Sequence, residues 1–162
     1  MGFRGAIETP VGVVAVESDG TAVTRVSWPR GAFATDESDA VVRRALAQLA
    51  DYFVGDLQTF DVPFDLGVQT DATRAVLMAL YETVGNGETV TYGELAARSG
   101  TTVPARGIGS IMGANPVPLI VPCHRVVASD GLGGYSGGAE GEGLVTKRWL
   151  LEHEGALPTA LF

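Results

Sequence analysis

The apolar residues of this chain change their spacing near residue 70, and this change constrains the fold more than any other feature. Before it, apolar and polar residues alternate over 5–28 with a break at 18–20, which predicts a β-hairpin. Residues 41–53 show helical spacing, and 59–64 are expected to be extended. From residue 70 to a turn at 85–87 the spacing is helical again. The pattern therefore predicts an α+β protein.

Two short helices are expected beyond residue 90. Thr91 and Glu94 have the spacing of a capping box, in which each side chain satisfies an otherwise unpaired amide at the start of a helix. Gly100 ends that helix, and Pro104 suits the first turn of the next, which runs to about Ala114. Two short helices joined by a tight turn predict a helix-turn-helix.

Length and composition limit the organisation and the chemistry. The 162 residues allow one large domain or two small ones that share a core, and we place two domains at 1–69 and 70–162. One cysteine excludes an intramolecular disulfide, and only two histidines, His124 and His153, argue against a metal site. No long apolar run or signal-like N-terminus is present, so we expect a cytoplasmic protein without membrane contact.

Cys123 is the only sulfur nucleophile, and it allows two interpretations. A lone cysteine usually packs as a small apolar residue, and the apolar run 119–121 just before it favours burial. Pro122 halts that run, however, and nucleophiles are often held where a chain emerges from a core. His124 or Arg125 would favour the thiolate, although in an extended chain adjacent side chains point to opposite faces. His124 would then reach the sulfur through a water or a bend.

The motif Pro122-Cys123-His124-Arg125 resembles the active-site motif of the O6-alkylguanine-DNA alkyltransferases. Order and spacing agree with that family from about residue 70 to residue 155. The resemblance implies a ribonuclease H-like N-terminal domain without nuclease acids, and a C-terminal domain with a winged helix-turn-helix. The other segments that carry it are Thr91–Ala96, Ala105–Gly109, Asn115–Pro118, Tyr135–Gly138 and Lys147–Gly155.

The same resemblance implies a reaction. The alkyl group of O6-alkylguanine would pass irreversibly to Cys123 after the nucleotide is flipped out of double-stranded DNA, because the target atom lies inside the duplex. The family needs no cofactor, and we expect a monomer. Whether O4-alkylthymine or bulky alkyl groups are accepted stays open. Two other classes also remain open, a lesion sensor that does not repair and a cysteine hydrolase that uses Cys123, His124 and Glu154.

Residue roles follow from the resemblance as well. Cys123 is the expected nucleophile, His124 its base, and Glu154 the carboxylate that orients His124. Tyr135 would donate to the leaving guanine, Asn115 would tie the turn before the cysteine, and Lys147 would hold the cysteine loop. The substrate pocket would contain Tyr92, Met112, Pro118, Val126 and Ser136, and the DNA would contact Tyr92, Arg106, Thr73, Arg74 and Gly109, with Arg106 as the finger that replaces the flipped nucleotide.

The charge balance requires an explanation in a protein expected to bind phosphate. The chain carries 19 acidic against 11 basic side chains, a net charge of -8. Over 92–127, however, Glu94 is the only acid against Arg98, Arg106 and Arg125, which is three minus one, or +2. The single lysine and the acidic composition resemble proteins of salt-loving archaea. Because molar salt weakens charge attraction to DNA, we expect binding to depend more on stacking, wedging and hydrogen bonds.

One segment departs from the family pattern. Residues 139–143 are inserted between the Tyr135–Gly138 loop and the closing helix, and they add Glu140 and Glu142 near the expected pocket mouth. Two interpretations are open for these carboxylates. They are either solvated surface charges, or groups that narrow the choice of substrate or bind a cation.

Overall fold

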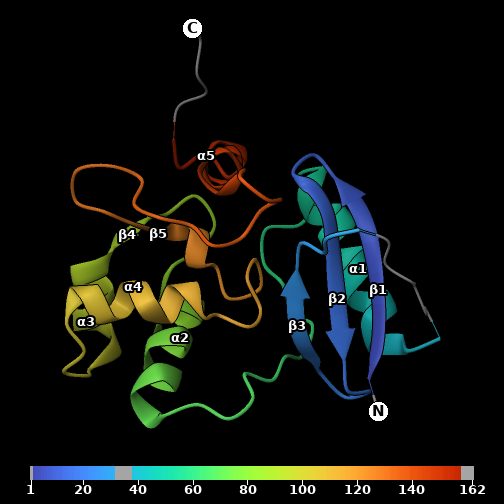
Figure 1. The fold of residues 1–162 in the computed structure, drawn as a ribbon, viewed down its shortest axis with the longest axis horizontal. Helices are drawn as coiled ribbons and strands as arrows, with labels where there is room; N and C mark the ends of the chain where they lie inside the picture. Colours follow the sequence, from blue (N-terminus) through green and yellow to red (C-terminus); the bar gives the residue numbers. More distant parts are fainter. Residues whose placement is uncertain (1, 32–37, 158–162) are drawn as a thin grey trace, which may run out of the picture.

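A three-stranded antiparallel sheet begins the chain in the computed structural model, which describes residues 2–31 and 38–157. The strands are β1 (Phe3–Thr9), β2 (Gly12–Ser18) and β3 (Val23–Ser27), with β2 in the centre (Figure 1). The sequence predicted a hairpin of two strands here, but the chain forms three strands, because it also turns at residues 10–11. Thr9 stabilises this turn, since its hydroxyl donates to the Gly12 carbonyl and accepts from the Val11 amide.

Helix α1 (Ala40–Phe53) packs against β1 and β2, as Figure 1 shows. It was predicted from its spacing, and the Asp39 carboxylate caps its first turn by accepting from the Val42 amide. The segment 59–64 was predicted to be extended, and at its end Phe64 forms a bridge with Val23 of β3.

The second half of the chain is mainly helical. Thr91 and Glu94 form the predicted capping box, and Gly100 ends that helix with a φ of 68°. Pro104 precedes the next helix as its N-cap residue, one position before its predicted place. No helix in the described ranges is long and apolar enough to cross a membrane. The elements are α2 (Asp71–Thr83), β4 (Val90–Thr91), α3 (Tyr92–Ser99), α4 (Ala105–Gly113), β5 (Val126–Val127), which pairs in parallel with β4, and α5 (Gly143–His153).

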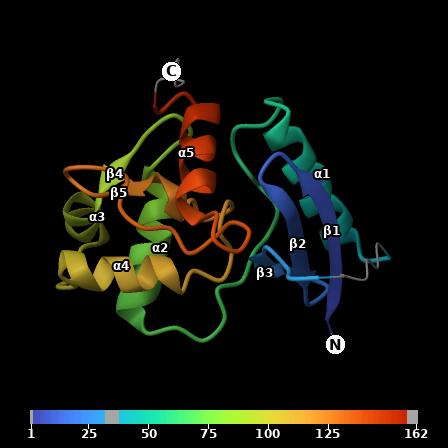
Figure 2. The same ribbon diagram turned by 45° about the horizontal axis from the view of Figure 1, so that its top comes forward.

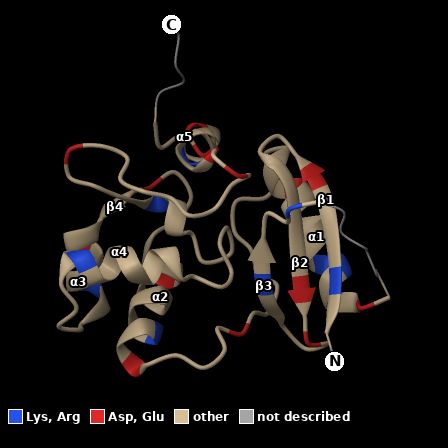
Figure 3. Cartoon of the chain, in the orientation of Figure 1, with Lys and Arg blue, Asp and Glu red and all other residues tan. Residues whose placement is uncertain are grey.

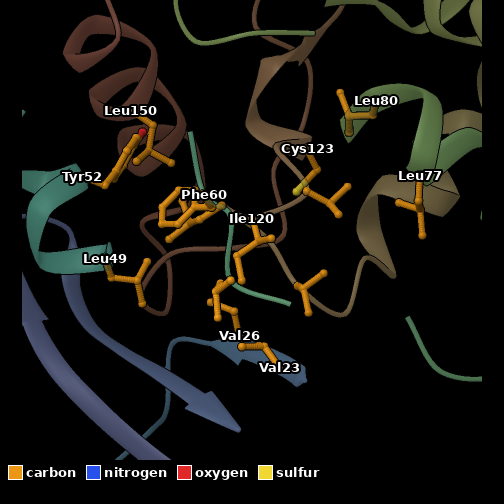
Figure 4. Packing of buried hydrophobic residues seen from close by; sticks show 14 of the residues in the cluster. Val23, Val26, Leu49, Tyr52, Phe60, Leu77, Leu80, Ile120, Cys123 and Leu150 are labelled. Atoms are coloured by element: carbon orange, nitrogen blue, oxygen red, sulfur yellow. The ribbon is translucent and has the colours of Figure 1, made fainter. Parts of the chain in front are cut away.

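The two halves share one hydrophobic core. The Val26 amide of β3 donates to the Pro116 carbonyl at 3.0 Å, so the sheet edge is hydrogen-bonded to the segment that leads to Cys123. In Figure 2, α5 lies on the side of the helical half that faces α1. Figure 4 shows that the cluster is continuous through Val23, Val26, Leu49, Tyr52, Phe60, Leu77, Leu80, Ile120, Cys123 and Leu150. The cysteine is therefore part of the core itself.

Candidate active site

Cys123 begins a short 3-10 turn, η1 (Cys123–Arg125), directly after the buried run 119–121. Cys123 is 6% exposed, so the residue is largely buried but still reaches a surface. The side chain packs as an apolar residue, and it also lines two cavities. The 3-10 turn supplies the bend in the chain that a direct approach of His124 to the cysteine would require.

The segment before the cysteine is held in an unusual conformation. Leu119 has a φ of 74°, a left-handed conformation that costs a residue with a side chain about 1–3 kcal/mol. Asn115 stabilises the turn from both sides, because its amide donates to the Val121 carbonyl at 2.8 Å and its oxygen accepts from the Val117 amide at 3.0 Å. The sequence predicted side-chain to backbone bonds at Asn115, and these bonds fix the path of the chain into Cys123.

His124 is fully buried and bonded to a carboxylate. Its Nε2 lies 2.8 Å from Oε2 of Glu154, whose side chain is also inaccessible to water. Burial lowers the pKa of His124, although the charge of Glu154 opposes this, so the ring is neutral at rest. A neutral ring bonded to a carboxylate through Nε2 carries its proton there, which leaves a lone pair on Nδ1. That Nδ1 has no hydrogen-bond partner.

The Glu154 carboxylate forms hydrogen bonds with three side chains, those of His124, Arg125 and Tyr52. Arg125 donates from Nε to Oε1 at 2.8 Å and from Nη2 to Oε2 at 3.1 Å, and the Tyr52 hydroxyl donates to Oε2 at 2.6 Å. Burial alone would raise the pKa of Glu154, but the bonds from His124 and Arg125 hold it well below its usual value. The carboxylate is therefore ionised at neutral pH.

Two of these contacts were not foreseen. Arg125 was counted in the positive charge of the stretch 92–127, but it is 6% exposed and its charge is neutralised by Glu154. The basic stretch 92–127 therefore presents two arginines and one acid at the surface, a net of +1. Tyr52 lies 102 residues from its partner, and only its place at the apolar end of a predicted helix could have indicated that it is buried.

Burial also governs the thiol. It raises the pKa of Cys123 to about 11, although a hydrogen bond from Asn115 and the positive charge of Lys147 act in the opposite direction. At neutral pH the group is a thiol, and a base must remove its proton before the sulfur can attack an electrophile. His124 is the buried base next to it in the chain.

Two adjoining cavities meet at Cys123. The larger, of about 710 Å³, extends to the sheet and contains Trp28 and the inserted segment in its lining. The smaller, of about 340 Å³, lies between α4 and the 131–138 loop. Predicted site residues that line one or both cavities are Cys123, Asn115, Tyr135, Met112, Pro118, Ser136, Tyr92 and Gly109.

Tyr135 presents a hydroxyl without a partner at these cavities. Its ring packs edge to face with Trp28 at 6.2 Å between centroids, and both the Tyr135 hydroxyl and the Trp28 indole nitrogen are buried without hydrogen bonds. Burial raises the pKa of Tyr135 well above its usual value, so the phenol keeps its proton. A buried donor without a partner is costly, which indicates a place for a ligand atom.

Lys147 joins the cysteine turn to the loop over the cavities. Its fully buried ammonium group donates to the carbonyls of Val126 at 2.7 Å and Gly134 at 2.8 Å, and burial lowers its pKa to about 8. Ser136 donates to the Gly113 carbonyl at 3.2 Å, and the Gly134 amide donates to the Tyr92 hydroxyl at 3.3 Å. The loop is thus attached to α3, α4 and α5.

The inserted segment lines the larger cavity but is exposed. Glu140 lies 3.8 Å from Arg30, and both side chains are more than 70% exposed, so the pair contributes little to stability. This agrees with the interpretation as solvated surface charge. In the described part of the chain, no three acidic, histidine or cysteine side chains form a group that could hold a metal ion.

Three of the five predicted DNA contacts, Arg106, Thr73 and Arg74, lie outside these two cavities. Arg106 is exposed in the first turn of α4, while Thr73 and Arg74 lie in the first turn of α2, where Arg74 donates to the Gly67 carbonyl. Figure 3 shows both signs of charge on the sheet, with red and blue positions on β1, red on β2 and blue on β3. The three strands together contain two acidic and two basic residues, so the strands themselves carry no excess of acid.

Known proteins match both parts of this architecture. Residues 71–156 match the family described as 6-O-methylguanine DNA methyltransferase, DNA binding domain. The methylated-DNA–protein-cysteine methyltransferase of Methanosarcina acetivorans is 35% identical over 161 residues, which cover 95% of this chain and 99% of that protein. The protein of the same name from Mus musculus is 52% identical over 92 residues, which cover 56% of this chain. The matched part spans only 41% of the mouse protein.

Solved structures agree with these matches. The O6-methylguanine methyltransferase of Mycobacterium tuberculosis has a TM-score of 0.82 and 36% identity, over 99% of this chain and 98% of that one. The OGT of the same organism in complex with DNA has a TM-score of 0.80 and 36% identity, over 95% and 93% of the two chains. The mixed α+β architecture is therefore confirmed, and the chain belongs to the O6-methylguanine-DNA methyltransferase family.

Proposed function

We propose that this chain repairs DNA by moving the alkyl group of O6-alkylguanine onto Cys123, once per molecule. One observation carries the proposal. The only thiol of the chain lies at the junction of two cavities, next in sequence to a histidine whose Nε2 is bound to a buried carboxylate and whose Nδ1 is unpaired. This is the arrangement that a nucleophile with a high pKa needs. We also propose that the protein acts as a monomer.

The proposed reaction uses each of these groups in turn. Nδ1 of His124 takes the proton of Cys123, directly or through a water, and Glu154 stabilises the imidazolium. The sulfur attacks the alkyl carbon, an S–C bond forms, and the bond from that carbon to O6 breaks. The Tyr135 phenol donates a hydrogen bond to the departing guanine, which gains the proton that the thiol lost. The thioether has no acyl group for water to attack, so the protein is used up.

We also assign α3 and α4 as a helix-turn-helix, with the 131–138 loop as its wing and residues 70–162 as the DNA-binding domain. The exposed residues of α4 are small or basic, which would let this helix approach the sugar-phosphate backbone closely. Gly109 and Tyr92 lie where α4 meets the smaller cavity. Ser136 would exchange its bond to Gly113 for one to the base, and the Val126 carbonyl, which accepts from Lys147, would also accept from the base.

Arg106→Ala should slow repair of duplex DNA about 10- to 100-fold. The gap left in the base stack would then stay unfilled, so that nothing offsets the flipping cost of a few kcal/mol. Repair of the free nucleobase O6-methylguanine should be unchanged, since a free base needs no flipping. Single-turnover rates on both substrates measure the two effects. Arg98→Ala, on the neighbouring helix, removes the same charge and is the control. Equal losses in both variants would make Arg106 a simple phosphate contact.

The function itself is tested by mass spectrometry. The protein is mixed with duplex DNA that carries one O6-methylguanine, and we expect one methyl group per molecule on the Cys123 peptide and none with unmodified duplex. Tight binding of the lesion without methylation would instead support a sensor. Turnover of esters or amides by the unmethylated protein would support a hydrolase. Either result would overturn the proposal.

A further inference from the structure

We propose that Tyr52 is a positioning residue for this reaction, because its hydroxyl holds the Glu154 carboxylate in the orientation that fixes His124. The inference rests on the proposed function and extends it to the N-terminal half of the chain. The N-terminal sheet and α1 would then do more than shield the C-terminal half from solvent, since a side chain of α1 would help to orient the catalytic residues.

The hydrogen bond between Tyr52 and Glu154 is short and is buried from solvent. The Tyr52 hydroxyl donates to Oε2 of Glu154 at 2.6 Å, and Tyr52 is 1% exposed. The same Oε2 accepts from Nε2 of His124 at 2.8 Å and from Arg125 at 3.1 Å. Three donors therefore converge on one oxygen, and the carboxylate, whose side chain is inaccessible to solvent, cannot rotate without losing these bonds.

Tyr52 is attached to the end of α5 a second time. Its backbone carbonyl lies 2.7 Å from Nε2 of His153, the residue before Glu154. Its ring packs against Phe60 at 5.3 Å and against the ring of His153 at 5.2 Å. Figure 4 shows the Tyr52 side chain reaching toward the helix of Leu150. The end of α1 is thus fastened to two successive residues at the end of α5, so the position of its hydroxyl is well defined.

The role would be electrostatic as well as geometric. The charged groups that act on His124 are Glu154, Arg125 and Lys147, and His153 contacts the backbone of Tyr52. A neutral donor on Oε2 draws charge away from the side of the carboxylate that faces His124. Without it, the carboxylate attracts the imidazolium more strongly, so the pKa of His124 rises and a larger fraction of the ring is protonated before Cys123 can use it. Loss of a merely structural contact would not move this pKa.

The test compares Tyr52→Phe with the unmodified chain and with Tyr81→Phe. Tyr81→Phe is the matched control, because it also removes one partly buried tyrosine hydroxyl, which donates to the Phe60 carbonyl and does not contact Glu154. We measure the single-turnover rate of methyl transfer from duplex O6-methylguanine between pH 5.5 and 8.5. Tyr52→Phe should be about 10-fold slower at pH 7, with the acid limb displaced about half a pH unit upward. Tyr81→Phe should do neither.

An NMR titration keeps the test independent of repair. The chain has two histidines, so the imidazole signals of His124 and His153 can be followed separately in each variant. We expect the pKa of His124 to rise in Tyr52→Phe alone. If that pKa and the acid limb both stay where they are in the unmodified chain, Tyr52 only packs and the inference is overturned. If the unmodified chain takes no methyl group, the proposed function fails, while the titration still decides the role of Tyr52.

Discussion

His124→Gln should slow methyl transfer to Cys123 about 10⁴-fold at pH 7, because a thiol with a pKa near 11 is then ionised in about one molecule in 10⁴. Glutamine keeps a donor for Glu154 but cannot accept the thiol proton, so the change removes the base and spares the carboxylate. The rate of the variant should rise about tenfold per pH unit from pH 7 to pH 9, as hydroxide takes over the deprotonation.

The unmodified chain should behave differently over the same range. Its rate should fall only at pH values below the lowered pKa of His124, where the ring is already protonated, and should be level above it. His153→Gln is the matched control, because it removes the other histidine, and its rate should stay within a few-fold of the unmodified chain. If the His124 variant has a level pH profile, or if its rate of methyl transfer falls less than tenfold, another group removes the proton of the Cys123 thiol.

Glu154→Gln should cost about 3–5 kcal/mol of unfolding free energy, because it leaves the buried Arg125 guanidinium without its anion. The bond from Arg125 to the Val84 carbonyl at 2.9 Å remains, but a carbonyl does not neutralise the charge. Urea unfolding at pH 7 measures the difference. Glu140→Gln is the control, since its ion pair with Arg30 spans 3.8 Å between two side chains that are more than 70% exposed, and its loss should change stability by less than about 0.5 kcal/mol.

This difference should also depend on pH with a defined sign. The pKa of Glu154 is lowered on folding, so its stabilising contribution is complete above the unfolded value of 4.5 and is lost as the pH falls below it. The gap between Glu154→Gln and the unmodified chain should therefore be constant from pH 7 to pH 5 and should shrink in more acidic solution. A gap that grows below pH 4.5 would show that the carboxylate is not held in its charged form.

Local signals in the sequence predicted the helices well. The capping box at Thr91 and Glu94 and the stop at Gly100 act within one or two turns, so they can be recognised without the rest of the fold. The turn after Thr9 was missed because the alternation of apolar residues continues through Val11 and Val13, which looks like one strand until the Thr9 hydroxyl is seen to close a turn.

The site was predicted as far as the family motif extends. His124 and Glu154 are in contact, and Cys123 precedes His124 in the same turn, but the other partners of these residues come from elsewhere. No local pattern indicates that Arg125 is buried, because its burial depends on the packing of α5 against η1. Tyr52 could not be paired with Glu154 at all, since a contact across 102 residues leaves no local pattern.

The separation of Tyr52 and Glu154 also sets when the site can form during biosynthesis. At about 5–20 residues per second, a ribosome needs roughly 5–20 s to pass from residue 52 to residue 154, and Cys123 is made within that interval. Until the last helix emerges, His124 has no carboxylate and the cysteine has no oriented base. A nascent chain therefore exposes its cysteine as an ordinary thiol, of which a few per cent is ionised at neutral pH, and it gains the proposed repair chemistry only when α5 completes the site.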